Sequence, residues 1–139
     1  MSDLPDIALT RDPLDTAQAA ARVTGPDAGG VAIFLGITRA EKGPGGNLVA
    51  LDYHAYDEMA LKELSKLVDL ARARWPVRSA VIWHRLGAVN VGEASVIVAV
   101  SCRHRAAAFE ACAWIMDELK KLVPIWKREV FEHGAKWKE

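Results

Sequence analysis

Apolar residues recur at three- and four-residue spacing in two long segments of the chain, which predicts two amphipathic helices. The first covers residues 58–75, after a cap at Asp57 and before Pro76, which blocks its continuation. Its predicted buried face consists of Ala60, Leu64, Leu67, Val68, Ala71 and Trp75. A third, shorter helix is predicted to end near Val23.

The second long segment, residues 104–123, combines an apolar stripe with cations. The stripe is formed by Phe109, Cys112, Met116 and Leu119, which have the spacing of one helix face. Lys120 lies four residues after Met116 and therefore at the edge of this stripe. Pro124 ends the helix, and the extended chain beyond it is expected to return Lys127 toward the same region.

Other segments have the apolar runs or the alternation that are typical of β-strands. The predicted strands cover residues 7–10, 31–37, 49–55, 80–83 and 94–102. The strand at 31–37 is apolar almost throughout, so we expect it to be buried. Residues 40–47 have turn chemistry, which predicts a β-hairpin over residues 31–55. A second hairpin is expected between the strands at 80–83 and 94–102.

The order of these elements predicts an α+β protein. Because consecutive strands are mostly connected as hairpins, we expect a largely antiparallel sheet covered by helices. No repeat and no long linker divides the 139 residues, so we expect a single domain over residues 1–139.

Composition and charge indicate a globular protein and argue against a general nucleic-acid-binding protein. Hydrophobic residues make up 51% of the chain and charged residues 26%, as in globular proteins. Eighteen basic and eighteen acidic residues cancel, so the global positive field that favours non-specific nucleic-acid binding is missing. No run approaches the ~20 residues of a membrane span, and we expect a cytoplasmic protein. Cys102 and Cys112 lack metal-ligand spacing and are expected to be buried thiols.

Cations stand at both ends of the predicted helix over residues 104–123. His104 and Arg105 come directly after an apolar strand, at a helix start where backbone N–H groups and the helix dipole favour an anion. Lys120 and Lys127 stand near the other end. The four residues together predict a site for an anionic ligand, whereas the two lysines alone are also typical of a solvated helix C-terminus.

Six short motifs occur in order between about residues 30 and 137. They are FLGITR at 34–39, LDYHAY at 51–56 with MA at 59–60, HRLG at 84–87, HR at 104–105 with AFE at 108–110, DELK at 117–120, and PIWKRE at 124–129 with Trp137. With these motifs the chain resembles the molybdopterin synthase catalytic (large) subunit family. The resemblance implies an α/β-hammerhead-type fold, a homodimer within a heterotetramer, and a small ubiquitin-like sulfur-carrier subunit with a C-terminal Gly-Gly.

The activity that the resemblance implies is a sulfur transfer without a metal or cofactor in the enzyme. C-terminal thiocarboxylates of the carrier supply one sulfur each, and the two dithiolene sulfurs convert cyclic pyranopterin monophosphate into molybdopterin, in molybdenum cofactor biosynthesis. Both reactants are anions, which lysine and arginine side chains can hold close together. The ammonium group of Lys120 is expected to be desolvated beside the apolar Met116, where it can pass protons and stabilise the oxyanion formed when sulfur leaves the carrier.

Roles for individual residues follow from the same resemblance. Lys120 and Lys127 are implied as catalytic residues, and Phe34 and Met116 as the lining of a tunnel for the carrier tail. Substrate-binding residues are implied to be Ile37, Thr38, Arg39, His104, Arg105, Lys120, Lys127, Arg128 and Glu129.

Two other classes of protein stay open on the residues alone. A non-catalytic binding module for a phosphorylated metabolite would use Arg39, His104 and Arg105, but would need neither a buried lysine nor a tunnel. An inactive dimeric scaffold would have lost its basic cluster, which is intact in this chain. His84 follows Trp83 in a predicted strand and is expected to be structural.

Overall fold

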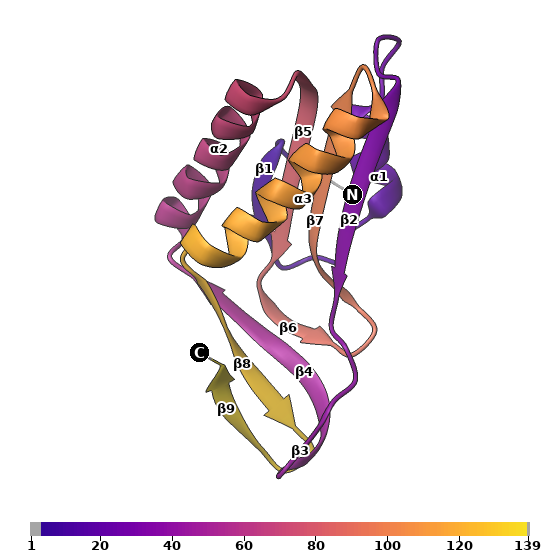
Figure 1. The fold of residues 1–139 in the computed structure, drawn as a ribbon. Coiled ribbons are helices and arrows are strands. Elements are labelled where there is room, and N and C mark those ends of the chain that lie inside the picture. Colours follow the sequence, from indigo (N-terminus) through magenta and orange to yellow (C-terminus); the bar gives the residue numbers. More distant parts are fainter. Residues whose placement is uncertain (1–3, 139) are drawn as a thin grey trace.

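The computed structural model describes residues 4–138, and its elements follow one another much as the sequence predicts (Figure 1). The helices are α1 (Thr16–Val23), α2 (Asp57–Arg74) and α3 (Arg105–Leu122). The strands are β1 (Ile7–Thr10), β2 (Gly30–Ile37), β3 (Lys42–Gly43), β4 (Gly46–Ala55), β5 (Val77–Arg85), β6 (Gly87–Asn90), β7 (Ala94–Cys102), β8 (Ile125–Phe131) and β9 (Gly134–Lys138).

The larger sheet has the strand order β1-β5-β7-β2. β7 pairs antiparallel with both β5 and β2, whereas β1 joins β5 in parallel. Helices α2 and α3 cover one face of this sheet, and α1 lies on the other (Figure 1). A largely antiparallel sheet covered by helices confirms the predicted α+β class.

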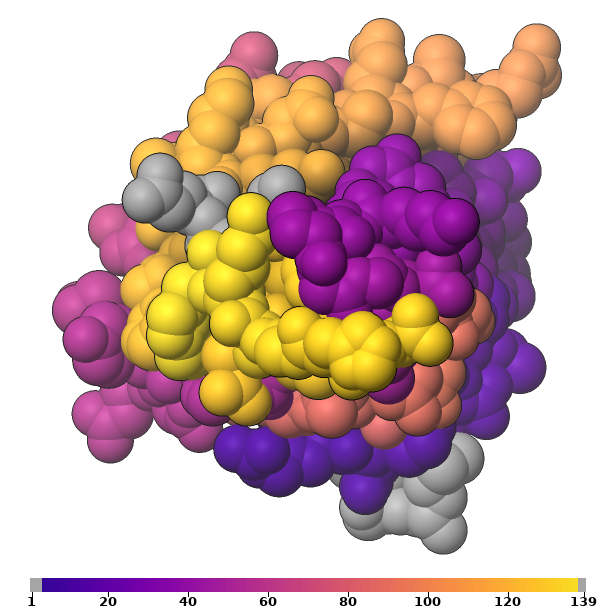
Figure 2. All heavy atoms as spheres, turned by 90° about the horizontal axis from the view of Figure 1, so that it is seen from below, coloured from indigo at the N-terminus to yellow at the C-terminus, as the bar shows by residue number. Residues whose placement is uncertain are grey.

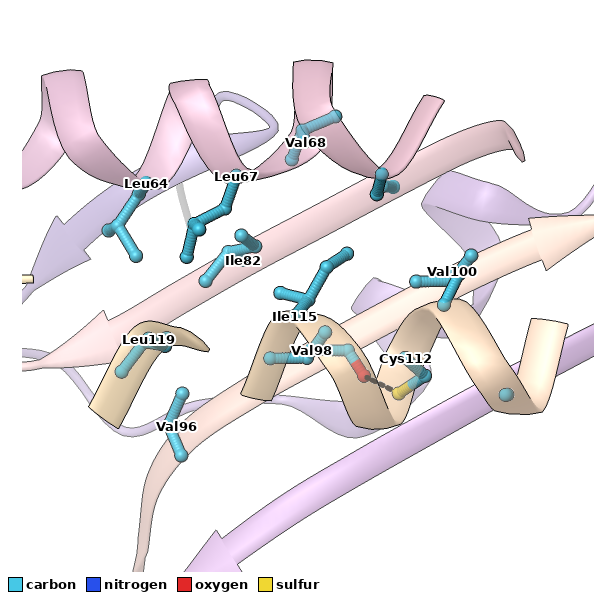
Figure 3. Packing of buried hydrophobic residues seen from close by; sticks show 14 of the residues in the cluster. Leu64, Leu67, Val68, Ile82, Val96, Val98, Val100, Cys112, Ile115 and Leu119 are labelled. Atoms are coloured by element: carbon cyan, nitrogen blue, oxygen red, sulfur yellow. Dashed lines mark hydrogen bonds between the residues drawn. The ribbon is translucent and has the colours of Figure 1, made fainter. Parts of the chain in front are cut away.

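The main core lies between α2, α3 and the larger sheet (Figure 3). Leu64 and Leu67 of α2 are buried there, as the helical spacing predicts, and Ile115 of α3 meets them. The Sγ atom of Cys112 donates a hydrogen bond to the carbonyl oxygen of Val98 over 3.4 Å. Burial raises the pKa of the Cys112 thiol to about 11, so this residue acts as a small apolar group, as predicted.

A second sheet lies beyond one end of the first (Figure 1). β4 pairs with β3, β6 and β8, and β9 extends this sheet from β8. In the register of β4 and β8, Tyr53 lies opposite Lys127 and Leu51 lies opposite Glu129. Directly opposite residues project from the same face of a sheet, so these four side chains share one face.

The predicted hairpin over residues 31–55 is wrong. β2 pairs with β7, whereas β4 pairs with β6 and β8. Only the short strand β3 folds back on β4, in the hairpin that pairs Lys42–Gly43 with residues 46–47. Turn chemistry marks where a chain reverses, but the partners of the long strands are chosen by packing between distant segments. The second predicted hairpin, between β5 and β7, is confirmed, and β6 lies in its connection.

The expectation that the segment at 31–37 is buried is also wrong, because β2 is an edge strand. Val31, Leu35 and Ile37 are 39%, 37% and 47% exposed. An apolar run is typical of a strand covered on both faces, but it does not distinguish a central strand from one at the sheet's edge. β2 therefore presents apolar side chains and an open strand edge at the surface of the chain.

Two details of the helices differ from the predictions. Phe109 is 65% exposed, because the buried face of α3 runs through Ala108 and Ile115, and Phe109 lies about 100° around the helix from Ala108. Tyr56, not Asp57, is the N-cap of α2. Asp57 instead lies in the first helical turn, where its negative charge is favourable near the positive end of the helix dipole.

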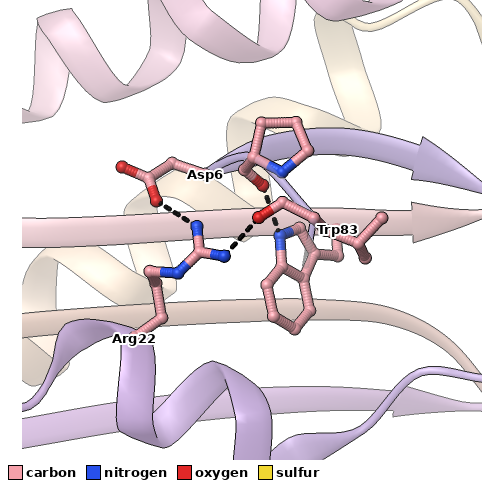
Figure 4. A network of polar contacts seen from close by, with 5 residues as sticks. Asp6, Arg22 and Trp83 are labelled. Carbon is pink, nitrogen blue, oxygen red and sulfur yellow. Dashed lines mark hydrogen bonds and ion pairs between the residues drawn. The ribbon is translucent and has the colours of Figure 1, made fainter. Parts of the chain in front are cut away.

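Polar contacts connect residues 4–6, which precede β1, to α1 and to β5 (Figure 4). Arg22 of α1 forms an ion pair with Asp6 at 2.7 Å and also donates to the carbonyl oxygen of Leu4. The indole N–H of Trp83 donates to the carbonyl oxygen of Pro5 over 2.8 Å. These bonds hold the segment before β1 against α1 and β5, and they satisfy the polar group of a buried tryptophan.

Candidate functional site

A cavity of about 720 Å³ lies where the larger sheet meets the second sheet. Its walls come from the end of β2, the last turn of α3, and the facing strands β4 and β8. Its lining residues include Phe34, Arg39, Tyr53, Met116, Lys120 and Lys127. Seen from below, residues of the C-terminal strands lie directly beside the segment around the end of β2 (yellow and purple in Figure 2).

The helix end and the following strand bring two lysines into this cavity. α3 ends at Leu122, and β8 begins at Ile125 after Pro124, so the chain reverses within a few residues. Lys120 and Lys127 consequently both line the cavity. This confirms the prediction that the chain after the proline returns Lys127 toward Lys120.

The two lysines differ in their surroundings. Lys120 is exposed, so the expected desolvation of its ammonium group is not present in the single chain. Lys127 is half-buried, and its Nζ atom lies 5.9 Å from the centre of the Tyr53 ring. An ammonium group over an aromatic face is attracted by the electrons of the ring, which helps to fix its position.

Arg39 supplies a third cation, from the segment that follows β2. Its side chain is 84% exposed and forms an ion pair with Glu41 at 3.4 Å. Both residues line the cavity, together with Ile37. An exposed ion pair of this kind contributes little to stability, so the guanidinium group can turn to another anion at small cost.

The cavity also contains a buried carboxylate. Glu129 is only 5% exposed and lines the same wall as Lys127, two residues earlier on β8. Side chains two residues apart on a strand project from the same face. The site therefore combines three cations with an acceptor group that is held away from bulk water.

Arg128 lies between these two residues and projects from the opposite face of β8. Its guanidinium group donates to Asp52 over 3.1 Å and lies 5.8 Å from the centre of the Trp137 ring. The structure thus places Arg128 outside the cavity, on the outer face of the second sheet.

Thr38, which is also predicted to bind substrate, does not line the cavity. It is buried, its N–H donates to the carbonyl oxygen of Glu93, and its own carbonyl oxygen accepts from the N–H of Gly92. Both backbone groups are therefore used to hold the segment after β2 against the turn before β7.

His104 and Arg105 lie at the far end of α3. The rise of an α-helix separates Arg105 from Lys120 by about 22 Å along the helix axis. Arg105 instead packs against Gly30, at the start of β2, where a Cβ atom would come within 2.9 Å of the Cα atom of Arg105. The prediction that cations from both ends of this helix meet in one site is wrong within a single chain.

An aromatic pair in the cavity wall is not part of the predicted site. Tyr53 and His84 form an edge-on ring pair with centroids 4.9 Å apart, and both line the cavity. His84 is 4% exposed, and its Nδ1 atom lies 2.8 Å from the carbonyl oxygen of Arg85. No pattern in the sequence brings His84 of β5 to Lys127 of β8. Tyr53 of β4 contacts both residues, through its ring contact with His84 and through the pairing of β4 with β8.

The protonation of His84 gives a testable pH dependence of stability. Burial lowers the pKa of His84 to about 4, against 6.5 for an exposed histidine. The unfolded chain therefore binds this proton as pH falls below 6.5, whereas the folded chain binds it only near pH 4. The resulting loss of folding free energy, fully absent above pH 6.5, should reach about 3 kcal/mol at pH 4.

Urea unfolding of the wild type and of His84→Asn at pH 7 and pH 4 measures this loss. The wild type should lose about 3 kcal/mol more between the two pH values than the variant, which has no imidazole to protonate. Equal losses in the two proteins would show that His84 is accessible to protons in the folded state.

The sequence profile of the MoaE protein family matches residues 9–122. The chain belongs to the MoaE family. One relative of this MoaE chain, the molybdopterin synthase catalytic subunit of Pyrococcus abyssi, is 47% identical over 135 residues, which cover 96% of this chain and 90% of the relative. The subunit of the same name from Drosophila pseudoobscura pseudoobscura is 44% identical, but this chain spans only 37% of its length.

A solved structure agrees with the family assignment. The crystal structure of molybdopterin synthase from Staphylococcus aureus superposes with a TM-score of 0.93 at 31% identity and covers 99% of both chains. This confirms the predicted fold class of the MoaE chain. Within residues 4–138, no helix combines the length and the apolar character needed to cross a membrane.

Proposed function

We propose that this chain is the catalytic subunit of a molybdopterin synthase, which transfers sulfur from a thiocarboxylated carrier protein to cyclic pyranopterin monophosphate. The observation that carries this proposal is the single cavity that collects Arg39, Lys120 and Lys127 beside the apolar residues Phe34 and Met116. A non-catalytic module for a phosphorylated metabolite would need one or two cations. It would not need Lys120 and Lys127 in addition to Arg39, nor apolar residues beside them.

The substrate is a cyclic phosphate ester that carries a pterin. Arg39 is proposed to bind its phosphate, because an exposed guanidinium group with one weak ion pair can form a charge-assisted, bidentate contact with phosphate oxygens. Ile37 lies beside Arg39 on the cavity wall and is proposed to contact the substrate. The Glu129 carboxylate is proposed to accept hydrogen bonds from pterin N–H groups, which are the donors that a buried carboxylate needs.

The lysines are proposed to act on the carrier. The thiocarboxylate sulfur would attack a carbon of the substrate and displace an oxygen substituent, so that a thioester links the carrier to the substrate. Water then attacks the thioester carbonyl, and the tetrahedral oxyanion collapses with cleavage of the acyl C–S bond, so that the carrier leaves as a carboxylate and the sulfur stays on the substrate. Lys120 stabilises this oxyanion and exchanges protons with the leaving groups, and Lys127 neutralises the substrate or the carrier tail. Docking of the carrier would exclude water from the exposed Lys120, which strengthens its interaction with the oxyanion.

The proposed partner is a small ubiquitin-like subunit with a C-terminal Gly-Gly. Phe34 and Met116 line the cavity and offer apolar walls to a narrow, glycine-rich tail. Residues without side chains pass such walls where bulkier residues would not. The carrier would therefore place its reactive carbonyl next to Lys120.

His104 and Arg105 are proposed to bind substrate from a second copy of the chain. About 22 Å along the axis of α3 separates Arg105 from Lys120, so His104 and Arg105 do not reach the cavity of their own chain. The edge strand β2 begins beside Arg105 and ends at the cavity, and it exposes Val31 and Ile37 along this path. A twofold contact along β2 would bury these apolar side chains and bring the N-terminus of one α3 toward the cavity of the other copy.

We also propose that residues 1–139 form a single domain, because the walls of the cavity come from both sheets. We further propose a cytoplasmic location. The buried cysteines Cys102 and Cys112 are both unpaired, as is usual for proteins of a reducing compartment.

Calorimetric titration of cyclic pyranopterin monophosphate tests the substrate site. Arg39→Ala removes a charge-assisted hydrogen bond worth about 1.5–3 kcal/mol, so affinity should fall about ten- to a hundred-fold. Arg128→Ala is the matched control: it removes the same charge from the outer face of β8 and should leave affinity within about twofold of wild type. Wild-type affinity in Arg39→Ala, or an equal loss in both variants, would contradict the proposed site.

A further inference from the structure

The buried ring of His84 stands out among the cavity walls because, among the residues that the structure describes, only one of its two nitrogens has a hydrogen-bond partner. Its Nδ1 atom lies 2.8 Å from the carbonyl oxygen of Arg85. A carbonyl oxygen can only accept, so Nδ1 carries a proton. Desolvation and the positive charge of Lys127 both lower the pKa of His84, so that the ring is neutral at physiological pH.

These facts fix the chemical character of the other nitrogen. In a neutral imidazole with a proton on Nδ1, the Nε2 atom has a lone pair and can only accept a hydrogen bond. The ring is held in place by its bond to the backbone and by its edge-on contact with Tyr53. His84 lines the cavity, although the residue is 96% buried.

We propose that His84 is a substrate-binding residue whose Nε2 atom accepts a hydrogen bond from an N–H group of the pterin. This inference rests on the proposed function, since it assigns a contact with the same substrate. His84 and Glu129 then form the acceptor side of the site, and Arg39, Lys120 and Lys127 form the donor side.

The contrast with the other cavity groups supports this assignment. Arg39, Lys120 and Lys127 carry only donors, which suit the phosphate and the thiocarboxylate but repel N–H groups. A pterin presents ring and amino N–H donors, which need acceptors inside the protein. A neutral acceptor beside Lys127 suits this task, because it adds no second negative charge close to the phosphate.

Two variants separate binding from structure, because each retains one of the two nitrogen functions. The amide of His84→Asn can replace Nδ1 and still donate to the carbonyl oxygen of Arg85, but it leaves no acceptor at the position of Nε2. The longer amide of His84→Gln can place its oxygen near the position of Nε2 but loses the short backbone contact. A purely structural histidine is therefore better replaced by asparagine, and a substrate-binding one by glutamine.

Anaerobic calorimetric titration of cyclic pyranopterin monophosphate into the full chain measures the difference. We expect His84→Gln to bind within about threefold of wild type and His84→Asn to bind about three- to tenfold more weakly. Wild-type affinity in His84→Asn, or affinity in His84→Gln as low as in His84→Asn, would overturn the assignment. A wild-type protein that does not bind this compound would instead refute the proposed function itself.

A measurement on the wild type keeps the proposal testable if either variant fails to fold. With ¹⁵N-labelled histidine, the resonance of the unprotonated Nε2 atom of His84 should move toward the protonated-ring position when cyclic pyranopterin monophosphate is added. Such a shift is the signature of a lone pair that accepts a hydrogen bond. An Nε2 resonance that is unchanged at saturating substrate would overturn the proposal.

Discussion

The Lys120→Ala variant should fold normally and lose nearly all molybdopterin formation. Lys120 is exposed at the end of α3, so its removal leaves no cavity in the core. The lost group is the ammonium proposed to stabilise the carrier oxyanion, and the removal of one such donor slows a reaction about a hundred- to a thousandfold. Single-turnover formation of molybdopterin from preloaded carrier measures this rate without the contribution of carrier exchange.

Two further variants separate a catalytic lysine from an ordinary surface charge. Lys121→Ala is the matched control, because Lys121 is the next residue of the same helix, has a 71% exposed side chain and pairs with Glu118 on the surface. It should react at the wild-type rate. Lys120→Arg keeps the charge, but its guanidinium group does not release a proton at working pH, so it should recover substrate binding far better than turnover. A near-normal rate in Lys120→Ala would show that Lys120 is not the catalytic group, and Lys127 would then be the first alternative.

A mixture of two inactive variants should regain activity if the site is shared between two copies. In a mixed dimer of Lys120→Ala and Arg105→Ala, one of the two cavities has an intact Lys120 and faces an intact Arg105. Random exchange of subunits should therefore restore about a quarter of the wild-type activity. The assay is run well below the KM for substrate, where loss of a phosphate contact lowers the rate most.

The matched control for this experiment mixes Lys120→Ala with Lys127→Ala. Both lysines line the cavity of the same chain, so every cavity of the mixed dimer lacks one of them and activity should stay low. Restoration by this control pair, or no restoration by the first pair, would contradict a substrate site completed by the second copy.

The helices could be predicted from the sequence because their signals are local. The buried face of α2 is set by residues three and four positions apart, and Pro76 and Pro124 mark where α2 and α3 cannot continue. The predicted burial of Phe109 is wrong, because an apolar residue one position away from the true stripe still fits an approximate helical pattern. The exposure of Phe109 at the start of α3 depends on where the sheet lies, and the spacing of apolar residues along the helix does not indicate this.

Strand pairing was less predictable than strand position. The predicted positions of β2 and β4 are correct, but their predicted pairing with each other is wrong, because β2 joins β7 and β4 joins β8, both of which come much later in the chain. The exposure of β2 follows from the same fact. Whether an apolar strand is central or at an edge is decided by partners that its own residues do not identify.

The candidate site shows the same division between local and distant information. Lys120 and Lys127 could be placed together because a single proline reverses the chain between them. His104 and Arg105 could not, because the length of α3 separates them from Lys120 in one chain. The contact of Tyr53 with His84, and the orientation of Arg128 toward Asp52, both depend on which strands meet at the second sheet.

Sulfur transfer itself is tested most directly by following isotopically labelled sulfur from the carrier. The chain is mixed anaerobically with cyclic pyranopterin monophosphate and a Gly-Gly carrier whose thiocarboxylate contains ³⁴S, and the product is analysed by mass spectrometry. The proposed function predicts molybdopterin with both dithiolene sulfurs labelled, and no product with a carrier that lacks its last two residues. Equal conversion with inorganic sulfide and no carrier, or no conversion with the intact carrier, would contradict it.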